Sequence, residues 1–113
     1  MHEMALAEEV QLIVAATAER HDMTRVTDIG LAIGAWSCVV PEALEAALEV
    51  ALAEGVAAGA RIGLMTVPGR LRCVGCGEEY EPEDRYEPCP ACGRPGAELL
   101  AGNDMTVMRV AGH

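Results

Sequence analysis

Four of the five cysteines in this chain form two Cys-x2-Cys pairs, with 12 residues between the pairs. These residues are Cys73, Cys76, Cys89 and Cys92. This spacing is typical of a tetrahedral zinc site in which four thiolates surround one Zn²⁺. A glycine follows each pair, at Gly77 and Gly93, and allows the backbone to fold back so that its amides approach the thiolates. The spacing therefore predicts two zinc knuckles that share one ion.

Other uses of these cysteines are a disulfide pair, a thioredoxin-type redox motif and an iron site of the rubredoxin kind. A redox Cys-x2-Cys normally occurs once and within a βαβ unit, whereas here the motif occurs twice. Iron is therefore the main alternative to zinc. A closed shell of four thiolates has no open position for a substrate, so the predicted zinc is structural rather than catalytic. The fifth cysteine, Cys38, lies apart from the pairs, and we interpret it as a buried spectator thiol.

The sequence opens Met1-His2-Glu3, which offers a second set of metal ligands. An α-amine, an imidazole and deprotonated backbone amides form a planar all-nitrogen set of the kind that Ni²⁺ or Cu²⁺ prefers. The bulky His2 hinders removal of the initiator methionine, so we expect the amine to remain on Met1. Acid should weaken this site because the imidazole and the amine must lose protons before they bind metal. A frayed terminus before a helix is the alternative interpretation. His21 and His113 have no visible partner and are not taken as ligands.

Helices and strands alternate before the cysteines. Apolar residues recur at helical spacing over 4–19, where they are Leu6, Val10, Ile13 and Val14, and again over 41–52. Alternation with a period of two predicts half-buried strands over 26–35 and 62–67. Pro41 fits the first turn of the second helix, because its missing N–H is no loss there.

The chain after the first pair is polar and then returns to a strand pattern. Residues 78–88 are rich in Glu, Asp and Pro, so their fold should depend on zinc. Alternation over 105–110 predicts a strand that rejoins the main body. We therefore predict an α+β fold: a small sheet of about three strands with two helices, plus an inserted zinc-ribbon subdomain. The α+β domain, which carries the N-terminal metal ligands, comprises 1–72 and 98–113, and the zinc ribbon comprises 73–97.

The chain is strongly acidic, with 18 acidic against 8 basic residues and a formal net charge of −10. Between the outermost zinc cysteines one arginine, Arg85, stands against six acidic residues: Glu78, Glu79, Glu81, Glu83, Asp84 and Glu87. Such a surface repels phosphate backbones, so we predict no nucleic-acid partner. No apolar run approaches the ~20 residues that span a bilayer, and the N-terminus lacks a basic segment followed by an apolar run. We therefore expect no membrane association and a cytoplasmic protein with reduced cysteines.

The MHE start, the helix, strand and second helix that follow, the two cysteine pairs and the closing strand together resemble the HypA family of hydrogenase nickel-incorporation proteins. The likeness covers essentially the whole chain. It implies that His2 binds nickel with the Met1 amine and the backbone nitrogens of His2 and Glu3, while the four cysteines hold structural zinc. It also implies a HypB-type GTPase as partner, with delivery to the large subunit of a [NiFe]-hydrogenase and, in some organisms, to urease maturation. In one departure, the Met4-Ala5-Leu6 segment lacks a polar residue near position five, so the helix start has no obvious side-chain cap.

Three functions follow from these features. The first is a nickel metallochaperone without a catalytic step; the chain has no GxxxxGK[ST] loop, so any GTP hydrolysis must come from a partner. The second is a zinc-ribbon interaction module without nickel transfer. The third is an enzyme, for which Cys38 with His21, or Glu3 beside His2, form no recognisable motif. A link between the two metal sites through Leu71 and the Met105 strand is a further hypothesis.

Overall fold

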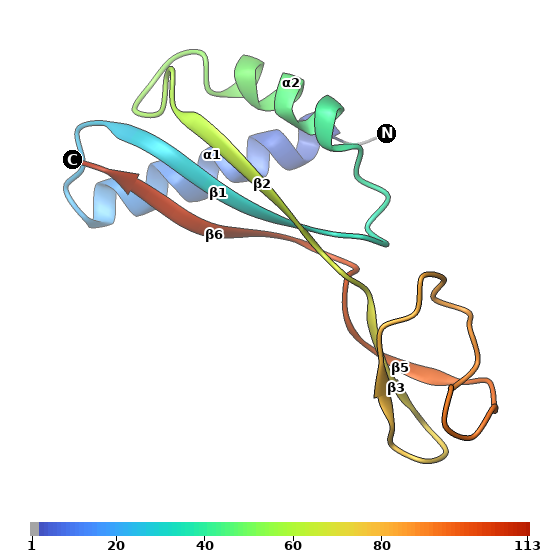
Figure 1. The fold of residues 1–113 in the computed structure, drawn as a ribbon. Coiled ribbons are helices and arrows are strands. Elements are labelled where there is room, and N and C mark those ends of the chain that lie inside the picture. The colour runs from blue at the N-terminus through green and yellow to red at the C-terminus, as the bar shows by residue number, and fades with distance from the viewer. Residues whose placement is uncertain (1–2) are drawn as a thin grey trace. The chain divides into compact units, whose positions relative to one another are not determined.

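The computed structural model describes residues 3–113, and the predicted ligands Met1 and His2 lie outside this range. The described chain is built from two helices and two small sheets (Figure 1). Its elements are, in chain order, α1 (Glu3–Arg20), β1 (Val26–Gly34), α2 (Pro41–Ala51), β2 (Arg61–Val67), β3 (Arg70–Cys73), β4 (Glu79–Tyr80), β5 (Ala97–Ala101) and β6 (Met105–Gly112). Neither helix within residues 3–113 is long and apolar enough to cross a membrane. The predicted fold class is confirmed.

The chain divides into two compact units. The first, here called the α+β unit, comprises the described chain up to Ala32 together with Val39–Met65 and Thr106–His113. The second, here called the cysteine unit, comprises Ile33–Cys38 and Thr66–Met105. It is wider than the span 73–97 that the spacing of the cysteines indicates, because β3, β5 and the segment after β1 belong to it.

A three-stranded sheet with the order β2-β1-β6 carries the α+β unit. The last strand therefore returns to pair with β1, as the alternation over 105–110 predicts. The two helices pack against each other and run along this sheet (Figure 1). The core is aliphatic, as expected for a chain without phenylalanine, and its largest fully buried side chains in this unit are Ile29, Leu31, Leu44, Leu48, Val10, Val14 and Val26.

The buried face of α1 differs from the predicted stripe. Val10 and Val14 are buried as expected, but Ile13 is 40% exposed, and the other positions on the buried face are the small residues Ala7 and Ala18. The buried residues of α1 are therefore spaced three or four positions apart, as in any amphipathic helix, but two of them are alanines. A hydrophobicity pattern weights Ile13 above Ala7 and so rotates the predicted face.

The start of α2 is held by a hydrogen bond between a backbone N–H and the side chain of Glu3. Val40 precedes the helix and makes no side-chain cap, and Pro41 occupies the first turn as predicted. The backbone N–H of Val40 instead donates to Glu3 Oε2, at 3.3 Å. Glu3 is 9% exposed, the only charged residue among the buried ones in residues 3–113. The first residue of α1 thus holds the first turn of α2.

Candidate metal centres

The cysteine unit is organised around the short strand β3, which ends at Cys73. Antiparallel pairing places β3 between β4 and β5, with Leu71 opposite both Tyr80 and Leu99. Cys73 lies opposite Ala97 at the end of this ladder. The sheet therefore fixes where the first cysteine pair begins. None of these three short strands was predicted as a sheet.

The two cysteine pairs form matching turns. In the first, the N–H of Cys73 donates to the Glu78 carbonyl at 2.8 Å, and the N–H of Gly77 donates to the Cys73 carbonyl at 2.9 Å. In the second, the N–H of Cys89 donates to the Arg94 carbonyl at 3.1 Å, and the N–H of Gly93 donates to the Cys89 carbonyl at 2.7 Å. Gly77 and Gly93 have φ values of 81° and 71°, the left-handed region that favours glycine. The predicted pair of knuckles is present.

The four sulfur atoms lie together as one donor set, all within 4.8 Å of one another. The Sγ–Sγ distance is 3.6 Å both for Cys73 with Cys92 and for Cys76 with Cys89. A disulfide needs about 2.05 Å, so these pairs are not disulfide-bonded. Four Zn–S bonds of about 2.3 Å in a tetrahedron place sulfurs roughly 3.8 Å apart. The cluster therefore fits a four-thiolate zinc site, and among residues 3–113 no other group of three or more Cys, His, Asp or Glu converges in this way.

Backbone amides surround the sulfurs and favour thiolates. The N–H of Ala91 donates to Cys89 Sγ at 3.4 Å. The N–H of Cys76 lowers the pKa of Cys73, and the N–H of Arg94, assisted by its guanidinium, lowers the pKa of Cys92 to about 6. The N–H of Glu78 favours the thiolate form of Cys76. The hydrogen bond between the Cys76 and Cys89 side chains and desolvation outweigh this effect and raise the pKa of Cys76 to about 12. Four like charges cannot coexist unaided, so a bound divalent cation is what allows all four to ionise.

Two arginines of β3 offset much of the acidic surface on this unit. Arg70 donates to Glu79 at 2.6 Å and to Glu81 at 3.3 Å. Arg72 donates to Glu98 at 2.7 Å and also approaches Glu79. These arginines lie just before Cys73, so a charge count restricted to the interval between the cysteines overstates the negative charge. These ion pairs connect β3 to β4 through Glu79 and to β5 through Glu98.

The lone tryptophan belongs to the cysteine unit. Trp36 Nε1 donates to the Glu83 carbonyl at 3.3 Å. Its ring covers Gly69 so closely that a Cβ there would lie 2.1 Å from the ring. Two residues later, Cys38 is exposed and has a φ of 64°. The prediction that Cys38 is buried is therefore wrong, because the turn that follows Trp36 points this thiol outward.

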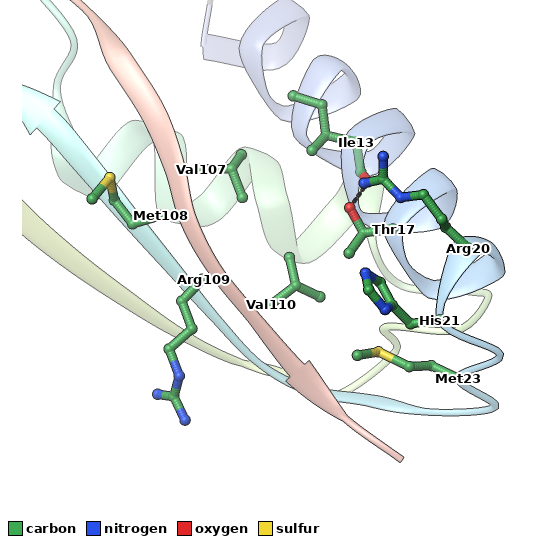
Figure 2. A pocket seen from close by; sticks show the side chains of 9 residues that line it. All are labelled: Ile13, Thr17, Arg20, His21, Met23, Val107, Met108, Arg109 and Val110. Carbon is green, nitrogen blue, oxygen red and sulfur yellow. Dashed lines mark hydrogen bonds between the residues drawn. The ribbon is translucent and has the colours of Figure 1, made fainter.

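His21 lines a groove on the α+β unit. The groove has a volume of about 490 Å³ and is formed by the C-terminal half of α1, Met23 and β6. Figure 2 shows His21 beside Thr17 and Met23, while the Arg109 guanidinium points away from α1. No other histidine and no cysteine or carboxylate lines this groove. Within residues 3–113, His21 belongs to no group of three or more His, Cys, Asp and Glu side chains that converge on one point.

Comparison with known proteins gives a consistent result. A family model described as HypA, "Hydrogenase/urease nickel incorporation, metallochaperone, hypA", matches residues 1–112. Hydrogenase maturation factor HypA 2 of Bradyrhizobium diazoefficiens is 39% identical over 107 residues, which cover 95% of each chain. Hydrogenase maturation factor HypA of Paracoccus denitrificans is 39% identical over 109 residues, with the same coverage. The solution structure of the Ni metallochaperone HypA from Helicobacter pylori superposes with a TM-score of 0.78 over 99% of this chain and 97% of that chain, at 19% identity, which shows a shared fold.

Proposed function

The chain belongs to the HypA family, and we propose that it is a nickel metallochaperone that binds Ni²⁺ at its N-terminus and delivers it during maturation of [NiFe]-hydrogenase. In this proposal Cys73, Cys76, Cys89 and Cys92 hold a structural Zn²⁺. The observation that carries the zinc part is the convergence of the four sulfurs within 4.8 Å. Family membership over residues 1–112 carries the nickel part.

The proposed nickel ligands are the Met1 amine, the His2 imidazole and the backbone nitrogens of His2 and Glu3. This nitrogen set suits a square-planar Ni²⁺ or Cu²⁺, and metal supply or geometry must select nickel. Glu3 is involved in a second way. Its carboxylate has a lowered pKa because the Glu3 N–H and then the Val40 N–H donate to it. Nickel at the Glu3 nitrogen would remove the first of these donors, so metal binding would leave the carboxylate dependent on Val40.

Zinc, when bound, supplies a cross-link between the two knuckles and no reactive position. The chain's own residues organise the rest of the site. Strand β3 places Cys73, the two glycine turns direct amides to sulfur, and the ion pairs of Arg70 and Arg72 connect the strands. We assign the protein no catalytic step of its own. Release of nickel is then the task of partners, which we propose are a HypB-type GTPase and the hydrogenase large subunit, with urease maturation as a further destination.

We also propose that the protein acts in the cytoplasm and binds neither membrane nor nucleic acid. Thiolate zinc ligands need a reducing compartment, and the net charge of −10 disfavours phosphate. A second candidate function is a zinc-ribbon interaction module without nickel transfer. In that case Tyr86 and Val74 of the cysteine unit, which are 83% and 75% exposed, would supply apolar surface for a partner.

A calorimetric nickel titration tests the proposal. The zinc-loaded, untagged protein with its authentic Met1 is titrated beside His2→Ala, and His21→Ala serves as the matched control because His21 lies in a groove without other metal ligands. We expect stoichiometric binding at about micromolar affinity or tighter, lost in His2→Ala and unchanged in His21→Ala. Equal binding by all three proteins would reject the N-terminal nickel site and favour the interaction module.

A further inference from the structure

The two knuckles match in backbone but differ at one equivalent position. The carbonyl that accepts the N–H of the first cysteine comes from Glu78 in one knuckle and from Arg94 in the other. Each residue follows its knuckle glycine directly. The side chains at this position therefore stand in equivalent surroundings with opposite charge, and only the arginine can donate a hydrogen bond to a thiolate.

Gly75, which lies against Arg94, is not required to be glycine by its backbone conformation. Gly75 precedes Cys76, and Ala91 is its equivalent in the second knuckle. Gly75 is not among the residues with positive φ, so its backbone conformation does not require glycine. A Cβ at Gly75 would lie 2.8 Å from Arg94 Cζ and 2.9 Å from Nη2. The missing side chain at Gly75 thus makes room for the guanidinium, which bridges from the second knuckle to the first.

The counter-charge of Arg94 is the sulfur cluster. Arg70 and Arg72 form salt bridges with glutamates, whereas Arg94 has no carboxylate partner within residues 3–113. Its guanidinium instead lies against the first knuckle beside Gly75, the residue before Cys76, and the nearby Cys92 thiolate raises the pKa of Arg94. Cys73 and Cys89 are 1% exposed, whereas Cys76 and Cys92 are the accessible members of the set. Arg94, beside Gly75, therefore places its positive charge next to Cys76, one of the two accessible members.

We propose that Arg94 is a positioning residue of the zinc centre, whose guanidinium reaches from the second knuckle over Gly75 of the first and offsets part of the negative charge of four thiolates on one Zn²⁺. This inference rests on the proposed zinc site. It explains how an accessible thiolate stays bound to the metal in a strongly acidic protein. It also explains why the two Cys-x2-Cys sequences differ in the residue before their second cysteine.

Two measurements on the full chain test this role. Zinc affinity is measured by competition with a chromogenic chelator. In Co²⁺-substituted protein, the thiolate-to-metal charge-transfer band reports on positive charge near the sulfurs, because such a charge lowers the energy of the sulfur lone pairs. For Arg94→Ala we expect zinc affinity to fall about ten-fold, and the band to move to lower energy.

Four further variants make the result specific. Gly75→Ala should act like Arg94→Ala, because its new methyl group displaces the guanidinium without changing the charge. Arg94→Lys should restore part of the affinity. Glu78→Ala, at the equivalent position of the first knuckle, and Arg85→Ala, which removes the same charge from a side chain placed over Tyr86, should match the unmodified protein.

The outcomes separate this inference from the zinc assignment. Tight zinc binding with an unchanged affinity and band in Arg94→Ala would overturn the role of Arg94 and leave the zinc site standing. An equal loss in Arg85→Ala would also overturn it, since a general charge effect would then suffice. Failure of the unmodified protein to bind Zn²⁺ or Co²⁺ would overturn both.

Discussion

The carboxylate of Glu3, in the first turn of α1, accepts a hydrogen bond from the backbone N–H of Val40, the residue that precedes α2. The two residues are 37 positions apart in sequence. Because Val40 has no side-chain cap and Pro41 contributes no N–H, this contact is an anchor between the starts of the two helices. It also joins the residue next to His2 to the beginning of α2.

Glu3→Gln should lower the melting temperature at neutral pH by a few degrees. The folded-state pKa of Glu3 lies below its usual 4.5, so its contribution to stability is present above that value and is lost as the pH falls through the folded pKa. Thermal unfolding of both proteins at neutral pH and at about pH 3 checks this. The difference between them should shrink in acid, while Glu9→Gln, an exposed position on α1, should show none. A difference independent of pH would contradict the charged role of Glu3.

Acylation of the N-terminus should abolish nickel binding. All eight basic residues are arginines, so the α-amine of Met1 is the only primary amine in the sequence. An amine-selective acylating reagent therefore reaches a single proposed ligand without mutation. We expect the modified protein to lose nickel binding in calorimetry but keep its zinc. Bound nickel should in turn slow the acylation, as followed by mass spectrometry. Unimpaired nickel binding by fully acylated protein would exclude the Met1 amine as a ligand.

Zinc removal should change the fluorescence of Trp36. Its indole N–H donates to Glu83, which lies between the cysteine pairs, and its ring rests on Gly69. Without the metal the polar segment around Glu83 loses its organisation, so the indole should become more hydrated and its emission should shift to longer wavelength. Emission is recorded during chelation, with far-UV circular dichroism as a control for α1 and α2. Emission that does not respond to chelation would show that this contact survives without zinc.

Gly34→Ala should destabilise the protein by about 1–3 kcal/mol, because the added methyl meets rigid backbone. A Cβ at Gly34 would lie 2.2 Å from the Gly102 carbonyl oxygen, and Gly102 itself has a φ of 100°. The matched control is Gly63→Ala in β2, where the nearest atom is at 3.9 Å. Urea unfolding of the two variants compares them. Equal stability of Gly34→Ala and Gly63→Ala would show that the strand can move to accept the methyl.

The sequence was sufficient for the features that depend on local patterns. The first helix was expected over 4–19 and spans Glu3–Arg20, and the knuckles followed from cysteine spacing and two glycines. The same kind of pattern misplaced Ile13, because burial by alanines leaves a weak hydrophobic signal. Patterns of this kind describe one segment at a time and carry no information on which segments meet.

The features that the sequence did not predict depend on contacts between distant segments. Strands β3, β4 and β5 are two to five residues long, and their pairing is supported by the ion pairs of Arg70 and Arg72 and by the knuckles. The contact of Trp36 with Glu83 spans 47 positions. An alignment of the two knuckles with each other shows where they differ: Gly75 stands opposite Ala91, and Glu78 stands opposite Arg94. That comparison points to Arg94 from the sequence.

The place of β1 between β2 and β6 has a consequence for synthesis on the ribosome. Thr27 in β1 approaches Ala111 in β6, 84 positions later. While the chain is being made, β1 can pair with β2 but has an open edge until β6 has left the exit tunnel, and residues 68–104 emerge in between. An open strand edge is a template for unwanted pairing with other chains. Nascent or prematurely terminated chains should therefore be the most aggregation-prone form of this protein, because the second edge of β1 is covered only when β6 pairs with it after translation.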